Sequence, residues 1–149
     1  MADREQGAGR PGQHLTVEVV TPAGAILGAA PADEVTAPGQ LGELGLLPGH
    51  VPLLTALRAG VLSLRVGQAV EMLAIGPGFL QVGAGDQVRI LSQMAKRPEE
   101  VDADAARQDR DHAEADLGKG LAQGAELDAL RATLEWAQAQ LAVLAAAPK

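Results

Sequence analysis

The sequence predicts an α+β fold in which short β-strands, packed as a sandwich or barrel, are followed by two α-helices. The boundary lies near Arg97–Pro98, where the composition changes. Before it, Gly and Pro are frequent and apolar side chains alternate with polar ones, as they do in half-buried strands. After it, Ala, Asp, Glu and Gln dominate, and leucines recur at helical spacing. Hydrophobic residues make up 47% of the 149 residues, which is enough to build a core.

The alternating segments of the first half are predicted as strands. They span residues 15–19, 61–66, 70–75, 79–82 and 87–91, with Gly, Pro and Asp in the turns between them. Short strands spaced in this way are typical of a sandwich or barrel. Because aromatic residues make up 1% of the chain, we expect its core to consist of Val, Leu, Ile and Ala.

Two helices are predicted after residue 97. Arg97-Pro98-Glu99-Glu100 is a good helix start, since Pro is tolerated in the first turn and acids stabilise the positive end of the helix dipole. This helix is expected to run to about Leu117 and to stop at Gly118-Lys119-Gly120. The second helix, about 125–146, carries a seam for a partner helix made of Leu127, Leu130, Leu134, Ala137, Leu141 and Leu144. The first helix offers only Ala106, Ala113 and Leu117 in return, so the two helices would bury little area, and a pair packed this weakly can detach or rearrange.

Composition and motifs exclude several classes of function. The net charge of −7 and the near absence of aromatic rings argue against nucleic-acid binding. The chain has no cysteine, and His14, His50 and His112 are too scattered for a metal site. Since it also lacks a phosphate-binding glycine loop and a recognisable nucleophile motif, we expect no cofactor and no catalytic residue.

No segment is predicted to enter a membrane. A run of about 18 apolar residues, the length that spans a bilayer as a helix, does not occur. Residues 1–13 are polar and glycine-rich without an apolar stretch, so we interpret them as a disordered tail and not as a secretory signal. The chain is expected to be cytoplasmic or to attach to a membrane complex through partners.

One central string resembles a known family. Residues 42–57 read GELGLLPGHVPLLTAL, similar to the GELGxLPGHxPLLTxL signature of the epsilon subunit of bacterial F-type ATP synthases. Residues 17–22, VEVVTP, resemble the first strand and turn of that family. Residues 75–82, IGPGFLQV, resemble its xSGGFLEV hairpin, with Gly76-Pro77 in place of Ser-Gly.

The resemblance implies an architecture and a set of partners. It implies a β-sandwich of about ten strands over residues 14–96, followed by an antiparallel two-helix hairpin over residues 97–149. The sandwich would bind the gamma subunit and the membrane c-ring, and the hairpin would reach the catalytic alpha/beta hexamer and modulate ATP hydrolysis. The chain would be a non-catalytic rotor component at the cytoplasmic face of the bacterial plasma membrane. A free-standing binding module and an enzyme are the competing hypotheses.

Glu43 and His50 are candidate contact residues within the signature. The family carries an acid at the position of Glu43, on a surface facing the polar loop of the c-ring; alternatively Glu43, expected on an exposed loop, is an ordinary solvated carboxylate. His50, expected at a turn, contacts another subunit or bonds to nearby backbone groups.

A second motif of the family is degenerate in this chain. Several epsilon subunits bind ATP through an I/L-D-x-x-R-A string at the start of the first helix. Here Val101, Asp102 and Ala106 match that string in type, but Ala105 replaces the arginine. Because a methyl group cannot replace a guanidinium that binds phosphate through two hydrogen bonds, we expect little or no ATP binding.

Candidate contacts of the hairpin lie on the second helix. Arg131 is its single base, against Glu126, Asp128 and Glu135, so attraction to acidic segments of the hexamer would be weak. Trp136 and Val143 project away from the leucine seam and form a second stripe that the partner helix would not cover. An aromatic residue on this stripe could anchor a subunit interface or pack on the sandwich.

Overall fold

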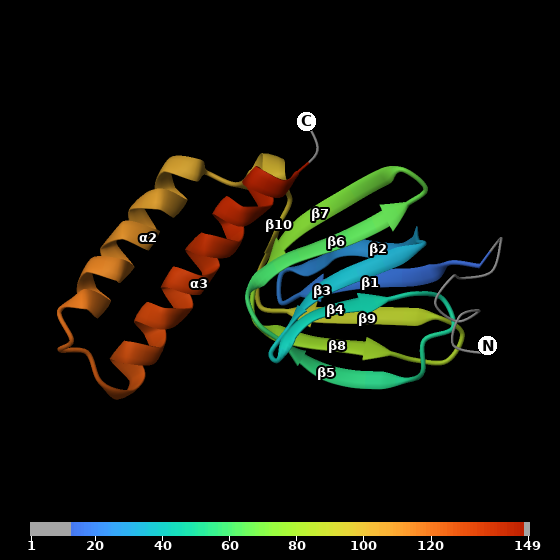
Figure 1. Ribbon diagram of the computed structural model, residues 1–149, viewed down its shortest axis with the longest axis horizontal. Coiled ribbons are helices and arrows are strands. Elements are labelled where there is room, and N and C mark those ends of the chain that lie inside the picture. The colour runs from blue at the N-terminus through green and yellow to red at the C-terminus, as the bar shows by residue number, and fades with distance from the viewer. Residues whose placement is uncertain (1–12, 148–149) are drawn as a thin grey trace.

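The computed structural model of the chain describes residues 13–147. Within these residues, ten strands form one sheet that folds over into two facing layers, and two long helices follow at one side (Figure 1). The predicted α+β class, a sandwich followed by a helical hairpin, is confirmed. Apart from Gln13, the predicted tail over residues 1–13 lies outside the described residues.

The strands pair in an order that differs from their sequence order. The path through the sheet is β10-β7-β6-β3-β5-β8-β9-β1-β2, with β4 paired to β3. β3 and β5 share one paired position, Gly39 with Leu57, and the sheet turns from one layer into the other there. Every pairing is antiparallel except that of β1 with β9. The bounds are β1 Leu15–Thr21, β2 Gly24–Ala32, β3 Glu34–Gly39, β4 Gly42–Leu46, β5 Leu53–Leu57, β6 Gly60–Val66, β7 Ala69–Ile75, β8 Gly78–Val82, β9 Gln87–Ser92 and β10 Ala95–Lys96.

The core lies between the two layers and is wholly aliphatic, as the composition predicted. Strands β1, β3 and β9 bury every second residue, which is the pattern of a sheet with one face on the core. The core residues are Leu15, Val17, Val19, Ala32, Val35, Ala37, Leu46, Leu57, Leu62, Leu64, Leu73, Ile75, Leu80, Val82, Val88 and Ile90.

The helices begin later than the sequence predicted. Pro98–Glu100 form a separate 3₁₀ turn, η1, and the first helix, α2, spans Ala103–Gly118. Val101 is extended, with φ −81° and ψ 127°. Asp102 then caps α2 by accepting a hydrogen bond from the Ala105 N–H at 3.1 Å. The prediction that helix α2 starts at Arg97–Pro98 is therefore wrong, because a second cap lies a few residues further on.

The second helix lies between the first and the sandwich. α3 spans Gly124–Ala146, packs along α2 and contacts strands β6 and β7 (Figure 1). Ala74 of β7 is fully buried although its neighbours Leu73 and Ile75 point into the core, so Ala74 lies on the opposite face, which α3 covers. No helix within residues 13–147 has the length and hydropathy to cross a membrane.

Arg97 fastens the junction between sandwich and hairpin. Its guanidinium forms an ion pair with Glu71 of β7 and donates to the Ile26 carbonyl of β2 at 3.1 Å. Its backbone N–H donates to the Glu100 carboxylate at 2.9 Å. One side chain thus ties strands from both layers to the start of the hairpin.

A charged cluster joins three segments at the opposite end of the sandwich. Asp33, between β2 and β3, accepts a hydrogen bond from the Gly67 N–H at 2.7 Å and one from His14 at 2.9 Å, and lies 3.9 Å from Arg65. The Gly67 hydrogen bond, aided by His14 and Arg65 against some desolvation, holds the pKa of the Asp33 carboxyl below its ordinary value.

The lowered pKa of Asp33 predicts a pH-dependent contribution to stability. The unfolded chain binds a proton at Asp33 before the folded chain does, so this contribution is present above about pH 4 and is lost as pH falls through the folded-state pKa. Urea unfolding midpoints measured from neutral to acidic pH should fall less steeply for Asp33→Asn than for the wild type. Asp109→Asn, at an exposed position on α2, serves as the control; equal slopes for all three chains would contradict the prediction.

Gly78 is the tightest backbone position in the sandwich. A Cβ at this position would stand 1.8 Å from the Leu91 carbonyl oxygen of the neighbouring strand. Gly78→Ala should therefore lower the free energy of unfolding by about 2 kcal/mol or more, because backbone must move to make room. Gly28→Ala, where a Cβ would meet nothing within 4 Å, should change it by less than about 0.5 kcal/mol. Denaturant titration of both variants compares them, and similar losses would refute the steric account.

Candidate interaction surfaces

The outer face of strands β1, β9, β8 and β5 carries a continuous apolar row. The strand register places Val20 opposite Leu91, Leu91 opposite Phe79 and Phe79 opposite Ala56. Phe79 is 55% exposed and Leu91 47% exposed. We call these four side chains the apolar row. Neighbouring apolar side chains left open to water in this way are typical of a protein-binding surface.

A groove of about 550 Å³ runs along the apolar row. Besides the row itself, it is lined by Thr21, Pro22, Gln40, Leu57, Pro77, Gly78, Ser92 and Gln93. These residues come from four strands, β1, β5, β8 and β9, and from the turns beside them, so the groove exists only in the folded sandwich. Its open shape and apolar lining suit a side chain or segment of another protein.

A polar row lies beside the apolar one. Two residues away from the apolar row on β1, β9 and β8, the side chains are polar. Glu18 stands opposite Arg89, and Arg89 stands opposite Gln81. The Arg89 guanidinium lies 3.6 Å from the Glu18 carboxylate, with both side chains open to solvent. The face can therefore offer a partner an apolar strip for affinity and charged groups that fix orientation.

Glu43 lies at the start of a strand, which corrects the expectation of a loop. It belongs to β4, is exposed and stands opposite Pro38 of β3. The turn that joins these strands presents Leu41 fully to solvent. Pairing with β3 holds this segment in an extended conformation. Leu41 and Glu43 thus form an exposed hairpin tip, and Gln40 of the same turn also lines the groove.

The ring of His50 bonds to nearby backbone, one of the two alternatives considered for it. Nδ1 lies 2.7 Å from the Val51 carbonyl oxygen, and the backbone N–H donates to the Leu47 carbonyl at 3.1 Å. The Gly49 N–H donates to the Asp86 carboxylate at 2.7 Å and anchors the segment to the turn after β8. Gly49 has φ +89°, which favours glycine.

The degenerate ATP-motif residues lie at the start of α2. Asp102 is the N-cap, and its carbonyl oxygen also accepts from the Ala106 N–H at 3.0 Å. Ala106 is 1% exposed, Val101 is half-buried, and Ala105 is exposed. No guanidinium occupies position 105, so the arrangement lacks the group that would bind phosphate.

The candidate residues of α3 fall into two environments. Arg131 is exposed. Val143 is fully buried and Trp136 half-buried, and each lies about one turn from Gln140. The Gln140 amide is bonded to Lys96 of β10 at 3.3 Å. The stripe of Trp136 and Val143 therefore faces the sandwich, and contact with another subunit requires the hairpin to move away.

Sequence reasoning missed the apolar row and the role of Arg97. A signal for the row existed: Val20 and Leu91 follow the core residues Val19 and Ile90, so each breaks the apolar–polar alternation of its strand. That these outward residues meet Phe79 follows from the register, which the sequence does not display.

Comparison with known proteins decides the family. Residues 14–98 match the family described as ATP synthase, Delta/Epsilon chain, beta-sandwich domain. The chain belongs to this family. It is 38% identical over 131 residues to ATP synthase epsilon chain 2 of Syntrophotalea carbinolica, which covers 88% of this chain and 94% of that relative. It is 48% identical over 101 residues to the ATP synthase epsilon chain of Moorella thermoacetica, covering 67% and 74%.

Solved structures share the fold of this epsilon-family chain. One is a chain of the Euglena gracilis mitochondrial ATP synthase OSCP/F1/c-ring assembly, with a TM-score of 0.76, 23% identity and coverage of 88% and 81%. Another comes from the central stalk and c-ring of the Tetrahymena thermophila mitochondrial ATP synthase, with a TM-score of 0.61, 18% identity and coverage of 89% and 97%. The family predicted from residues 42–57 is confirmed.

Loss of the arginine predicts that the isolated chain binds ATP weakly or not at all. The reason is that Ala105 cannot form the paired hydrogen bonds of a guanidinium with phosphate. Isothermal titration calorimetry of the purified chain with ATP should give no saturable heat at micromolar concentrations. Micromolar affinity would place a site elsewhere, and loss of that heat in Arg131→Ala would locate it on α3.

Proposed function

We propose that this chain is the epsilon subunit of a bacterial F-type ATP synthase, a non-catalytic part of the rotor that couples the catalytic hexamer to the membrane c-ring. The apolar row carries the proposal, because it is an exposed apolar surface on the domain that matches the family. Relatives named as ATP synthase epsilon chains, at up to 48% identity, support it. The chain would work at the cytoplasmic face of the plasma membrane, held there by its partners.

In this proposal, residues 14–96 bind the gamma subunit through the apolar row. Burying Phe79 and Leu91 under a partner would remove from water the apolar area that these side chains now expose. Aromatic side chains are enriched in the cores of protein interfaces, and binding hot spots cluster near the centre of such surfaces. Glu18 and Arg89, at the rim, would fix the orientation of the partner more than its affinity.

The exposed hairpin tip is the proposed contact with the c-ring. Leu41 and Glu43 project there, and Gln40 links the tip to the groove beside the apolar row. One side of the sandwich could then engage both rotor partners at once. Two weak contacts on one rigid body reinforce each other, since the second forms at high effective concentration.

Residues 97–149 are the proposed regulatory part, acting on ATP hydrolysis through the alpha/beta hexamer. Arg131 is outnumbered by acids on α3, so charge attraction to acidic segments of the hexamer would be small. Trp136 and Val143 offer an apolar alternative, but both lie on the face that α3 turns to the sandwich. Modulation through them requires undocking first.

A tagged full-length chain should co-purify with gamma and c-ring subunits from membranes of its own organism. Phe79→Ser should weaken binding to gamma about tenfold or more, because it removes the aromatic centre of the apolar row while the core stays intact. Val66→Ser, which changes an exposed apolar residue at the far end of β6, is the matched control and should bind like the wild type.

Two results would count against the proposal. Recovery of the folded wild-type chain without any rotary ATPase subunit would favour a free-standing binding module. Equal binding to gamma by Phe79→Ser, Val66→Ser and the wild type would leave the rotor function intact but would move the gamma contact away from the apolar row.

A further inference from the structure

A buried polar side chain lies in the contact between α3 and the sandwich. Gln140 is 5% exposed, on a face whose other members are Trp136, Ala139 and Val143. We call these four residues the docking face of α3. A buried amide lowers the stability of the folded state unless its hydrogen bonds are made. Leu or Met at position 140 would pack without this penalty.

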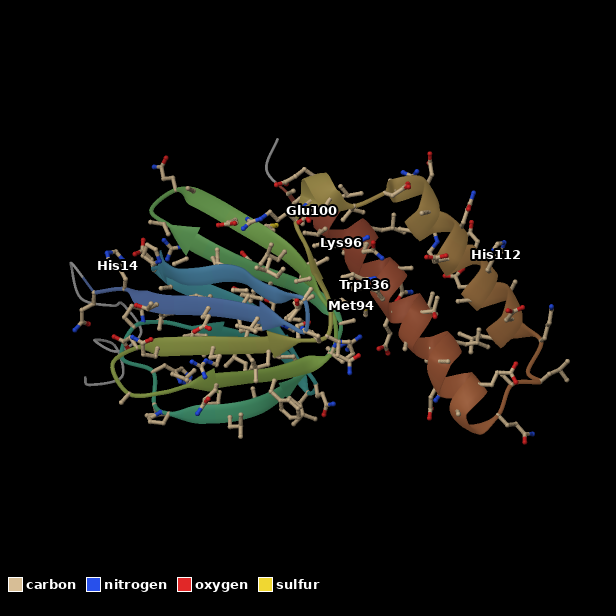
Figure 2. The ribbon with its side chains drawn as sticks, turned by 180° about the vertical axis from the view of Figure 1, so that it is seen from behind. His14, Met94, Lys96, Glu100, His112 and Trp136 are labelled. Carbon is tan, nitrogen blue, oxygen red and sulfur yellow. The ribbon has the colours of Figure 1, made fainter. Side chains whose placement is uncertain are left out.

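Both ends of the Gln140 amide are bonded. Its Oε1 accepts a hydrogen bond from the Lys96 ammonium at 3.3 Å, and its Nε2 donates to the Trp136 carbonyl, one turn earlier, at 3.4 Å. Within residues 13–147, the bond to Lys96 is the one side-chain hydrogen bond between α3 and the sandwich. Figure 2 shows Lys96 and Trp136 at this boundary.

Lys96 is held where it can meet Gln140. It lies on β10, opposite Ala74 of β7, the buried alanine under α3. The next residue, Arg97, is fixed to both layers of the sandwich by its ion pair with Glu71 and its hydrogen bond to Ile26. The ammonium of Lys96 therefore projects from a fixed strand, and the position of α3 must adjust to it.

The apolar part of the docking face does not fix one position by itself. Ala139 and Val143 are small and Trp136 is only half-buried, so neighbouring positions of α3 along β6 and β7 would bury similar apolar area. A hydrogen bond has a shorter range, and a shift of α3 by one helical turn, about 5.4 Å, would carry the Gln140 amide away from the Lys96 ammonium. Buried polar residues fix the register of packed helices in this way, at a cost in stability.

We propose that Gln140 and Lys96 form a polar latch that fixes the docked position of the hairpin on the sandwich. Docking one turn away along α3 would leave the Gln140 amide buried without a partner from the sandwich. The latch thus selects one docked position and keeps docking weaker than an all-apolar face would make it. The inference concerns the isolated chain and holds whatever the assembly in which the chain works.

The chain contains its own reporter of docking. Trp136 is its single tryptophan and lies on the docking face, so indole fluorescence reports on the hairpin alone. Acrylamide quenching of Trp136 in the full-length chain, in low urea where circular dichroism shows an intact sandwich, measures the ratio of docked to undocked hairpin. The ¹H–¹⁵N indole resonance of the same residue shows how many docked positions exist.

The experiment is a double-mutant cycle with a matched control. Lys96→Met keeps an aliphatic side chain but removes the donor, so the Gln140 oxygen is left buried without a hydrogen bond. The ratio of docked to undocked hairpin should therefore fall about tenfold. In a Gln140→Met background the same Lys96→Met change should have no effect. In a Gln138→Met background, which alters an exposed glutamine of the same helix, it should keep its full effect.

The second readout tests position. Gln140→Met alone should dock at least as tightly as the wild type, but its indole resonance should broaden or split as α3 samples several positions. The proposal is overturned if Lys96→Met leaves quenching unchanged, or if its effect persists in the Gln140→Met background. It is equally overturned if Gln140→Met retains a single sharp indole resonance.

Discussion

The packing of α3 on strands β6 and β7 decides which surfaces of this protein are free to act. It buries Ala74 on the outside of one layer and leaves the outside of the other layer open to water. The apolar row lies on that open layer, so a partner can bind the sandwich while the hairpin stays docked. The two activities proposed for the chain, rotor binding and regulation, thus use opposite faces of one small domain.

The two contacts that hold the molecule together differ in strength. The core between the layers is built from interlocking Leu, Ile and Val side chains, each removed almost completely from water. The docking face of α3 offers one valine, one alanine, a half-buried tryptophan and the amide of Gln140. Local opening should therefore begin at the hairpin long before the sandwich is disturbed. The opening should stop at Arg97, because its guanidinium is bonded to Glu71 and Ile26 of the sandwich.

Local sequence patterns predicted the α+β architecture, but they did not predict which strands pair with each other. Alternation in residues 15–19 and 87–91 is visible within each strand, and such patterns predicted β1, β6, β7, β8 and β9 one by one. The strands β2 to β5 and β10 were not predicted in this way. The start of α2 could not be predicted either, because Pro98 fits a 3₁₀ turn as well as a helix and Asp102 supplies a second cap.

The candidate site was predicted only in part for the same reason. Glu43 and Trp136 could be singled out from the sequence, one by a motif and the other by its spacing from the leucine seam. The apolar row depends on the register of four strands, and the latch joins residues 44 positions apart. Neither feature can therefore be recognised from a short segment of the sequence.

The parallel pairing of β1 with β9 has a consequence for the order of folding. Thr16 of β1 stands opposite Gln87 of β9, so β1 leaves the ribosome before almost all the rest of the sandwich, and its partner β9 is synthesised much later. Pairings that close so large a loop are slow steps in folding. β2 can meet β1 at once and shield one of its edges in the meantime. The apolar row is completed only when β9 arrives, so a nascent chain gains its partner-binding face late, after most of its strands have been synthesised.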